Sequence, residues 1–272
     1  MSGAYNLGFS PDPAAIDRFA KLAGRAPGVV HYYQSWGRDF QPTHANTVVS
    51  RGATPLISWE PWGGLDASGK HDAYVQSYAR AVKNWGGSVY LRVGHEMNLN
   101  LFPWSDPTKF IAGWRRMVDT FRAEGATNAK FVWCPNVTYG GYFPMKEYFP
   151  VSNYVDWLCL DGYNYGANRR SGWETFDQLF GYSINQITAL APGKPLMIGE
   201  FSSAEQGGSK ADWITNAFGT AIKKYPAIRA VVWFSDNYAS SGQADWRLET
   251  SQSAIDAYRR AMTDPYYHGK MP

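Results

Sequence analysis

The chain contains eight short apolar segments that recur along its whole length, and most are followed by a stretch with helical spacing. A segment that is apolar throughout, rather than at every second position, is typical of a strand in a sheet buried on both faces. Eight strand–helix units in about 250 residues predict a (β/α)8 TIM barrel, an α/β fold. The segments are Tyr5–Phe9, Val29–Tyr33, Thr54–Trp59, Ser88–Val93, Lys130–Cys134, Val155–Leu160, Pro195–Ile198 and Ile228–Phe234.

A doubly wound open sheet is the alternative arrangement for strands and helices in this order. The sequence has neither the GxGxxG nor the GxxxxGK loop that would favour it. It also has no linker and no break in composition that would divide the chain. We therefore expect a single catalytic barrel domain over residues 1–272.

Composition excludes several classes of protein. Apolar residues make up 44% of the chain, enough for a sizeable core, yet they form no run long enough for a membrane-spanning helix. The net charge of +3 is small and dispersed, which argues against a nucleic-acid partner. We expect a monomer that binds neither nucleic acid nor membrane.

Cysteine and histidine usage favours a protein without a metal or cofactor. Cys134 and Cys159 each lie inside an expected strand, which favours buried free thiols, with a bond between neighbouring strands as the alternative. The five histidines are scattered, without the paired spacing of a metal site. The chain begins Met1-Ser2-Gly3 without a signal peptide, so we expect a secreted mature domain whose leader is absent from this sequence, or else a cytoplasmic protein.

Polar side chains gather where the strands end, and in this barrel class active sites lie at the carboxyl ends of the strands. The fourth strand is apolar through Leu91 and then runs into Arg92, His95, Glu96 and Asn98. The other strand ends add further polar and aromatic residues, namely His31, Tyr33, Trp36, Trp59, Glu60, Asn136, Asp161, Tyr163, Glu200, Trp233 and Asp236.

Two of these residues, Glu96 and Glu200, come from the fourth and seventh strands and should face each other across the barrel mouth. Glycoside cleavage requires such a pair, because one carboxyl group protonates the leaving oxygen and the other attacks the anomeric carbon. A retaining enzyme places the two about 5–5.5 Å apart. The alternative is that either glutamate forms a rim salt bridge with Arg92.

Aromatic residues are abundant, with 12 Trp, 18 Tyr and 14 Phe. Many of them fall at strand ends and in loops, where their flat faces can stack on the C–H faces of sugar rings. Trp36, Trp62 and Trp104 are candidates for platforms of outer sugar-binding subsites, although large aromatics also fill cores.

Arg92-x-x-His95-Glu96-Met97-Asn98 and Ile198-Gly199-Glu200 resemble the strand-end motifs of glycoside hydrolase family 26, and the resemblance covers the whole barrel. It implies that Glu96 is the acid/base and Glu200 the nucleophile. It further implies that His95 orients the substrate or the acid/base, Tyr163 holds the nucleophile, and Trp233 supports the sugar. The remaining candidates for sugar contacts are His31, Trp36, Trp59, Arg92, Trp104 and Asn136.

The chain departs from the family directly after this motif, where Leu99-Asn100-Leu101 replaces the usual glycine and first aromatic residue. This segment lies on the leaving-group side, so the departure concerns the choice of sugar more than the chemistry.

The expected activity is that of a retaining endo-β-glycanase without cofactor, with β-1,4-mannan as the first substrate. Mixed-linkage β-1,3-1,4-glucan and β-1,3-xylan are the alternatives. A non-catalytic carbohydrate-binding barrel is the rival from another class. An isomerase or aldolase would need a lysine base, a phosphate site or a metal, which the strand ends do not offer.

Overall fold

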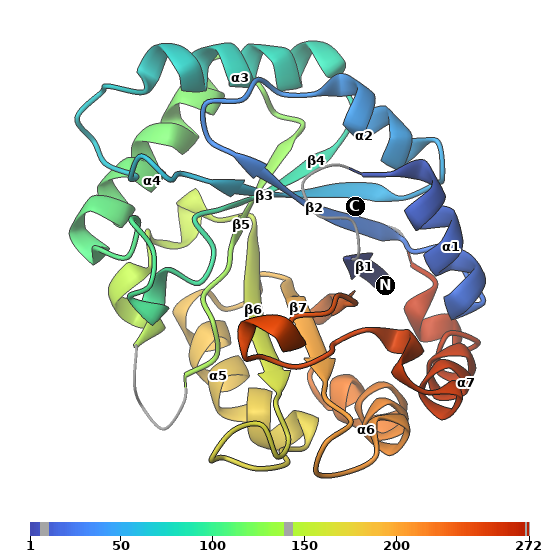
Figure 1. The fold of residues 1–272 in the computed structure, drawn as a ribbon. Coiled ribbons are helices and arrows are strands. Elements are labelled where there is room, and N and C mark those ends of the chain that lie inside the picture. The colour runs from blue at the N-terminus through green and yellow to red at the C-terminus, as the bar shows by residue number, and fades with distance from the viewer. Residues whose placement is uncertain (6–10, 139–143, 270, 272) are drawn as a thin grey trace.

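The computed structural model of the protein describes residues 1–5, 11–138, 144–269 and 271. Eight parallel strands follow one another in chain order and close into a barrel. Helices surround the strands, as Figure 1 shows. The predicted (β/α)8 barrel is therefore confirmed. Among the described residues, no helix is long and apolar enough to cross a membrane.

The strands lie close to their predicted positions, apart from the first. They are β1 Ser2–Tyr5, β2 Val29–Ser35, β3 Thr54–Glu60, β4 Val89–Val93, β5 Ala129–Trp133, β6 Trp157–Asn164, β7 Leu196–Ser203 and β8 Ile228–Phe234. The strand expected over Tyr5–Phe9 begins earlier, because Ser2–Tyr5 pairs with β8. Its remaining positions, 6–9, lie outside the described residues.

Seven α-helices lie in the described part of the chain. They are α1 Pro13–Ala23, α2 Pro42–Val49, α3 Asp72–Trp85, α4 Pro107–Ala123, α5 Phe176–Leu190, α6 Lys210–Asn216 and α7 Gln252–Ala261. Helices α1 and α4 begin directly after Asp12 and Asp106, and each aspartate side chain accepts hydrogen bonding from a backbone N–H of the first turn. After β5, the described residues form two short 3-10 segments, Met145–Tyr148 and Ser152–Tyr154.

Each strand sends alternate side chains into the barrel and out toward the helices. On β3, Leu56 joins the apolar core inside the barrel, whereas Ile57 and Trp59 join the core between the sheet and the helices. Above the inner apolar layer, the inward positions become polar, beginning with Ser58 on this strand. This alternation decides which strand-end residues can reach a substrate.

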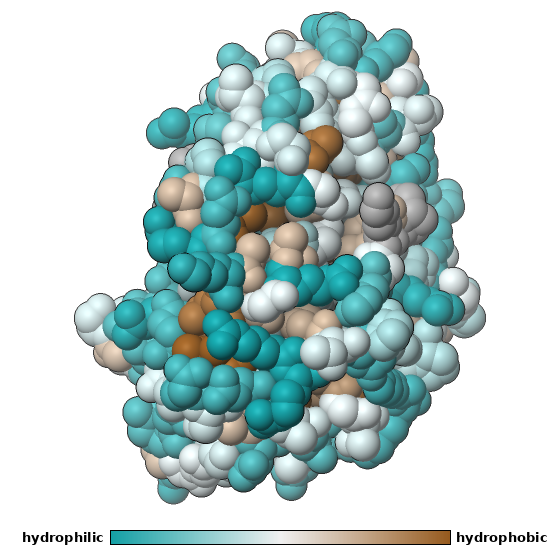
Figure 2. All heavy atoms as spheres, turned by 90° about the vertical axis from the view of Figure 1, so that its right-hand side faces the viewer, coloured by the Kyte–Doolittle hydropathy of each residue, from teal (hydrophilic) through white to brown (hydrophobic). Residues whose placement is uncertain are grey.

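The helices turn their polar sides outward. The face in Figure 2 is largely hydrophilic, and apolar side chains are visible on it mainly as small patches in hollows. This distribution is expected where the apolar stripe of each helix packs against a barrel.

Candidate active site

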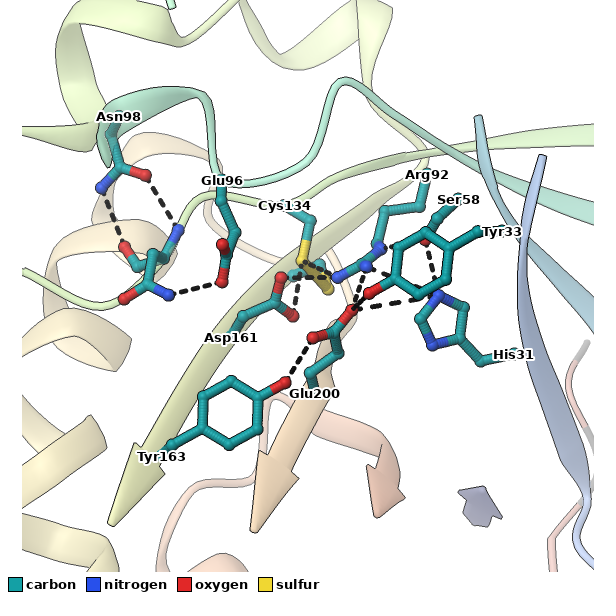
Figure 3. The surroundings of a disulfide bond; sticks show 12 residues. His31, Tyr33, Ser58, Arg92, Glu96, Asn98, Cys134, Asp161, Tyr163 and Glu200 are labelled. Carbon is teal, nitrogen blue, oxygen red and sulfur yellow. Dashed lines mark hydrogen bonds and ion pairs between the residues drawn. A yellow bond between two sulfur atoms is a disulfide. The ribbon is translucent and has the colours of Figure 1, made fainter. Parts of the chain in front are cut away.

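The mouth of the barrel brings together the two predicted carboxylates. Glu96 follows β4, Glu200 lies on β7, and Figure 3 shows both side chains facing the same space. Carboxylate oxygens of Glu96, Asp161 and Glu200 all lie within 4.8 Å of one another. For Glu96 and Glu200, this is close to the separation of about 5–5.5 Å that a retaining mechanism uses.

Three donors hold the carboxylate of Glu200. Tyr33 donates its hydroxyl to Oε1 over 2.6 Å, and Tyr163 donates to Oε2 over 2.5 Å. The guanidinium of Arg92 also donates to Oε1. Because the donors come from three different strands, they fix the position of the Glu200 carboxylate at the mouth.

Glycine is required beside this nucleophile candidate. A Cβ on Gly199 would lie 2.4 Å from Sγ of Cys159 and 2.9 Å from Oδ1 of Asp161. The register of β7 against its neighbours also shifts around this point. The absence of a side chain therefore allows β7 to approach β6 closely and to turn Glu200 toward the mouth.

Glu96 has the opposite electrostatic environment. Burial, followed by repulsion from Glu200, raises the pKa of Glu96 to about 7, although the amide of Asn136 partly opposes the rise by donating to Oε1 over 2.6 Å. A carboxyl group with this pKa still carries a proton near neutral pH. Glu96 is therefore suited to give a proton, and Glu200 to attack.

The backbone at Glu96 is itself unusual, because its φ of 51° lies in the left-handed region that residues other than glycine rarely adopt. Two hydrogen bonds hold this conformation: Glu96 N–H donates to the carbonyl of Cys134 over 2.8 Å, and Leu99 N–H donates to the carbonyl of Glu96 over 3.0 Å. Strained backbone of this kind is frequent at active sites.

Asn98 fixes the position of Asn136, the residue that donates a hydrogen bond to Glu96. Its Nδ2 donates to the carbonyl of Asn136 and its Oδ1 accepts from the N–H of Asn136, both over 2.9 Å. This pair of bonds orients Asn136 toward Glu96. Asn136 was expected to touch the sugar, but the contact that the structure assigns to its side chain is with Glu96.

Arg92 does not bind substrate, which corrects its place among the expected sugar contacts. Its side chain has no exposed surface and lies behind Glu200. Besides Glu200, it donates to Ser58 Oγ over 2.7 Å and to Asp161 Oδ2 over 2.5 Å. Arg92 therefore acts on the nucleophile candidate and joins it to Asp161.

The two histidines of the mouth are neutral. Burial, with the positive charge of Arg92, holds the pKa of both His31 and His95 well below the usual value. His31 is fully buried, with Nε2 2.6 Å from Ser58 Oγ, so a direct sugar contact is wrong for it. His95 is buried at 5% exposure and packs against Tyr33 and Phe102, and its expected role in orienting the substrate or Glu96 stays a prediction.

Three tryptophans were expected to touch the sugar, Trp233 and Trp104 as platforms and Trp59 as a further contact, and all three predictions are wrong because the side chains are inaccessible. Trp233 has 0% exposure and packs outside the barrel against Phe201, Trp213 and Tyr258. Trp59 also has 0% exposure and belongs to this outer core, and Trp104, at 1%, lies beneath Phe102.

Trp36 is half-buried and stacks on Trp59 at 4.5 Å, so most of one face is already covered. Trp62, by contrast, is 51% exposed at the rim. It is the one of the three predicted outer platforms that keeps a large open surface.

Tyr33 and Asp161 were noted at strand ends, but sequence reasoning gave them no role on Glu200 or Arg92. The signal that could have found them is alternation. Counting in twos from Val29 on β2 places Tyr33 inside the barrel, and counting from Cys159 on β6 places Asp161 there.

Cys134 and Cys159 form a disulfide in the structure, so the prediction of free thiols is wrong and the alternative of a bond between neighbouring strands is confirmed. The reason is geometric, because β5 and β6 are adjacent and both side chains point inward. Figure 3 shows the bond beside the side chains of Arg92 and Asp161.

The carboxylates of Glu96, Asp161 and Glu200 have a spacing that a cation could use. Here the guanidinium of Arg92 already bonds to two of them, Asp161 and Glu200. The cluster thus has a positive partner of its own, and its chemistry is that of paired carboxyl groups.

No protein-family model matches the chain. A curated protein with similar sequence is endoglucanase H of Acetivibrio thermocellus, which is 37% identical over 278 aligned positions that cover 96% of this chain. The chain spans 30% of that relative's length.

Solved structures with the same fold include two mannanases of glycoside hydrolase family 26. A modular endo-β-1,4-mannanase from Cellulomonas fimi superposes with a TM-score of 0.70 at 18% identity, over 98% of this chain and 71% of that one. The catalytic domain of an endo-β-1,4-mannanase from Bacillus sp. JAMB-750 gives 0.71 at 18% identity, over 98% and 86%. The resemblance noted in the sequence is thus confirmed at the level of the fold.

Proposed function

We propose that the chain belongs to glycoside hydrolase family 26 and is a retaining endo-β-glycanase that hydrolyses a β-linked polysaccharide by double displacement. The observation that carries this proposal is the pair of opposed carboxyl groups at the mouth. Glu96 has a raised pKa, whereas three donors position the carboxylate of Glu200, and oxygens of the two side chains lie within 4.8 Å of each other.

In the first step, an oxygen of Glu200 attacks the anomeric carbon while Glu96 gives its proton to the leaving glycosidic oxygen. The bond to the leaving sugar breaks, and an ester forms between Glu200 and the remaining chain. Arg92, Tyr33 and Tyr163 hold the carboxylate of Glu200 in the attacking position.

In the second step, the ester has removed the negative charge of Glu200, and with it one of the two causes that raise the pKa of Glu96. Glu96 is then a carboxylate that can take a proton from water. The activated water attacks the anomeric carbon from the side the leaving group occupied, and Glu200 is released as a carboxylate. Two inversions give a product with the original β configuration.

The substrate predicted first is β-1,4-mannan. A β-glucan, including mixed-linkage glucan, is the second candidate, and one observation favours it. The relative that is 37% identical over 96% of this chain is named an endoglucanase, whereas the mannanases of known structure share only the fold at 18% identity. β-1,3-Xylan stays a third candidate on the sequence resemblance alone.

The test is hydrolysis of mannan, glucomannan, lichenan and β-1,3-xylan, with sizing of the products and proton NMR of the first anomer released. We expect β-anomers and internal cleavage of one of these polymers. The Glu200→Ala variant should lose at least about a thousandfold in kcat. Full activity in this variant, or an initial α-anomer, would overturn the proposal; binding without hydrolysis would favour the carbohydrate-binding barrel.

We also propose that the protein acts outside the cell as a monomer. A polymeric substrate and a buried disulfide both suit an oxidising, extracellular setting. Fractionation of the native host and gel filtration of the purified protein test the two statements separately.

A further inference from the structure

Glu60 is an inward-facing carboxylate to which the proposed mechanism gives no role. It ends β3, two positions after Ser58, which contacts Arg92, and the same alternation turns Trp59 outward. Glu60 is only 5% exposed to solvent. Glu60 lies at the carboxyl end of β3, so it faces the same mouth of the barrel as Glu200 on β7, and the charges of Arg92 and Glu200 both act on its carboxyl group.

The loop at Glu60 is held by the backbone. The carbonyl of Glu60 accepts from the N–H of Trp36 over 2.8 Å and from the N–H of Trp62 over 3.0 Å. These bonds would exist with any side chain at this position. The carboxylate is therefore not needed to fix the loop.

Few hydrogen bonds stabilise the buried carboxylate of Glu60. Its Oε2 accepts one hydrogen bond from Nε1 of Trp62 over 3.2 Å. Arg92, the nearby cation, directs its own hydrogen bonds to Ser58, Asp161 and Glu200. A carboxylate can accept about four hydrogen bonds, so Glu60 keeps capacity for donors from a ligand.

Contacts with neighbouring side chains also fix the ring of Trp62. The indole N–H of Trp62 donates to Glu60, and the ring lies edge-on to Trp104 at 5.2 Å and to Phe102 at 6.2 Å. These contacts fix the ring while half of the residue stays exposed. A rigid aromatic face next to a carboxylate suits a ligand with C–H groups on one side and hydroxyl groups at its edge.

We infer that Glu60 and Trp62 form one sugar-binding unit, in which Trp62 stacks on a hexopyranose ring of the substrate chain and Glu60 accepts hydrogen bonds from its hydroxyl groups. This inference rests on the proposed function for the identity of the ligand. Because a carboxylate accepts from hydroxyls only in certain orientations, the unit would help to choose between sugars that differ at one carbon.

The test compares Glu60→Gln and Trp62→Ala with matched controls. Glu147→Gln alters an exposed glutamate on the 3-10 segment Met145–Tyr148, and Tyr182→Ala removes an aromatic ring on α5 that is 60% exposed. Kinetics on the polysaccharide that the wild type cleaves are combined with calorimetric titration of β-1,4-mannopentaose, cellopentaose and a mixed-linkage glucan tetrasaccharide.

We expect each variant at the unit to lower kcat/KM, and the affinity for at least one oligosaccharide, by about 10- to 100-fold, since a hydrogen bond to a charged group is lost or a stacked ring is removed. The controls should stay within twofold. The Glu60→Gln variant should melt no lower than the wild type, because it removes a buried charge. In the variant that carries both substitutions, the fold-loss in kcat/KM should be smaller than the product of the two single fold-losses, because the residues act together.

Unchanged affinity and kcat/KM in both variants would overturn the inference. It would also fail if the loss of affinity accompanied a fall in melting temperature, or if the fold-loss in kcat/KM of the double variant equalled the product of the two single fold-losses. If the wild type binds an oligosaccharide through Glu60 and Trp62 but cleaves none of the polymers, the proposed function fails and the inference stands. If it binds none of the three oligosaccharides, the inference fails as well.

Discussion

At the scale of single residues, the site depends on giving two glutamates opposite tasks. Burial and the nearby charge of Glu200 raise the pKa of Glu96 to about 7, and the hydrogen bond from Asn136 partly opposes this rise. Glu200 has a cation and two hydroxyl donors around it. The difference in environment, rather than in side-chain chemistry, separates the proposed proton donor from the proposed nucleophile.

The first prediction concerns pH. Glu96 must carry its proton in the free enzyme, so kcat/KM should fall as pH rises through about 7. In the Asn136→Ala variant, a hydrogen bond that favours the ionised form is lost, so the pKa of Glu96 should rise. The alkaline limb of the kcat/KM profile should therefore move to higher pH, and a shift to lower pH would contradict this assignment.

The second prediction concerns Tyr33, whose hydroxyl bonds to Glu200 over 2.6 Å. In Tyr33→Phe, we expect kcat to fall by about 10- to 100-fold with little change in KM, because the nucleophile loses a charge-assisted hydrogen bond. Tyr182→Phe on α5 is the control for removal of a tyrosine hydroxyl far from the mouth. A change confined to KM would mean that Tyr33 serves the sugar rather than Glu200.

At the scale of elements, the face that a strand residue presents decides its role. Trp233 and Phe234 are neighbours on β8, yet Trp233 belongs to the core between the sheet and the helices, and Phe234 belongs to the core inside the barrel. A shift of one residue exchanges the two faces of a strand. The sequence resemblance placed a tryptophan at the end of the right strand but on the wrong side of it.

The third prediction follows from this packing. Trp233→Ala should destabilise the protein by about 3–5 kcal/mol, because a cavity opens among Phe201, Trp213 and Tyr258. The melting temperature should fall by roughly 6–20 °C. At temperatures where the variant stays folded, KM should be unchanged. The exposed Trp62→Ala variant should show the reverse, with altered KM and similar stability; a raised KM with normal melting in Trp233→Ala would contradict the structure.

At the scale of the whole molecule, the barrel is a closed ring of strands, and β1 is the element that closes it. Ser2–Tyr5 pairs with β2 on one side and with β8 on the other. The amino group of Met1 also donates over 3.1 Å to the carbonyl of Arg229, which precedes the part of β8 that pairs with β1. Closure removes the free edges that an open sheet would expose.

The fourth prediction is that deleting residues 1–5 destroys cooperative folding. The edges of β2 and β8 would lose their hydrogen-bond partners, so we expect aggregation in gel filtration and no sharp thermal transition by circular dichroism. Deleting residues 269–272, which contain no strand in the described part of the chain, is the control and should leave the transition intact. A monomeric truncation at residue 6 that melts normally would show that β1 is dispensable.

The sequence determined the parts of this protein that depend on local pattern. Continuous apolar segments and the motifs around Glu96 and Glu200 predicted the barrel and its two carboxylates, because each signal lies within a few neighbouring residues.

Tertiary structure alone decided which side chains meet. Three features depend on residues from different strands or layers. They are the hydrogen bond between Tyr33 and Glu200, the disulfide between Cys134 and Cys159, and the packing of Trp233 in the outer core. Such contacts depend on barrel closure and on which face each strand turns inward. Both are set by the packing of the whole ring, since a local pattern of apolar residues is the same for a strand and for its one-residue slip.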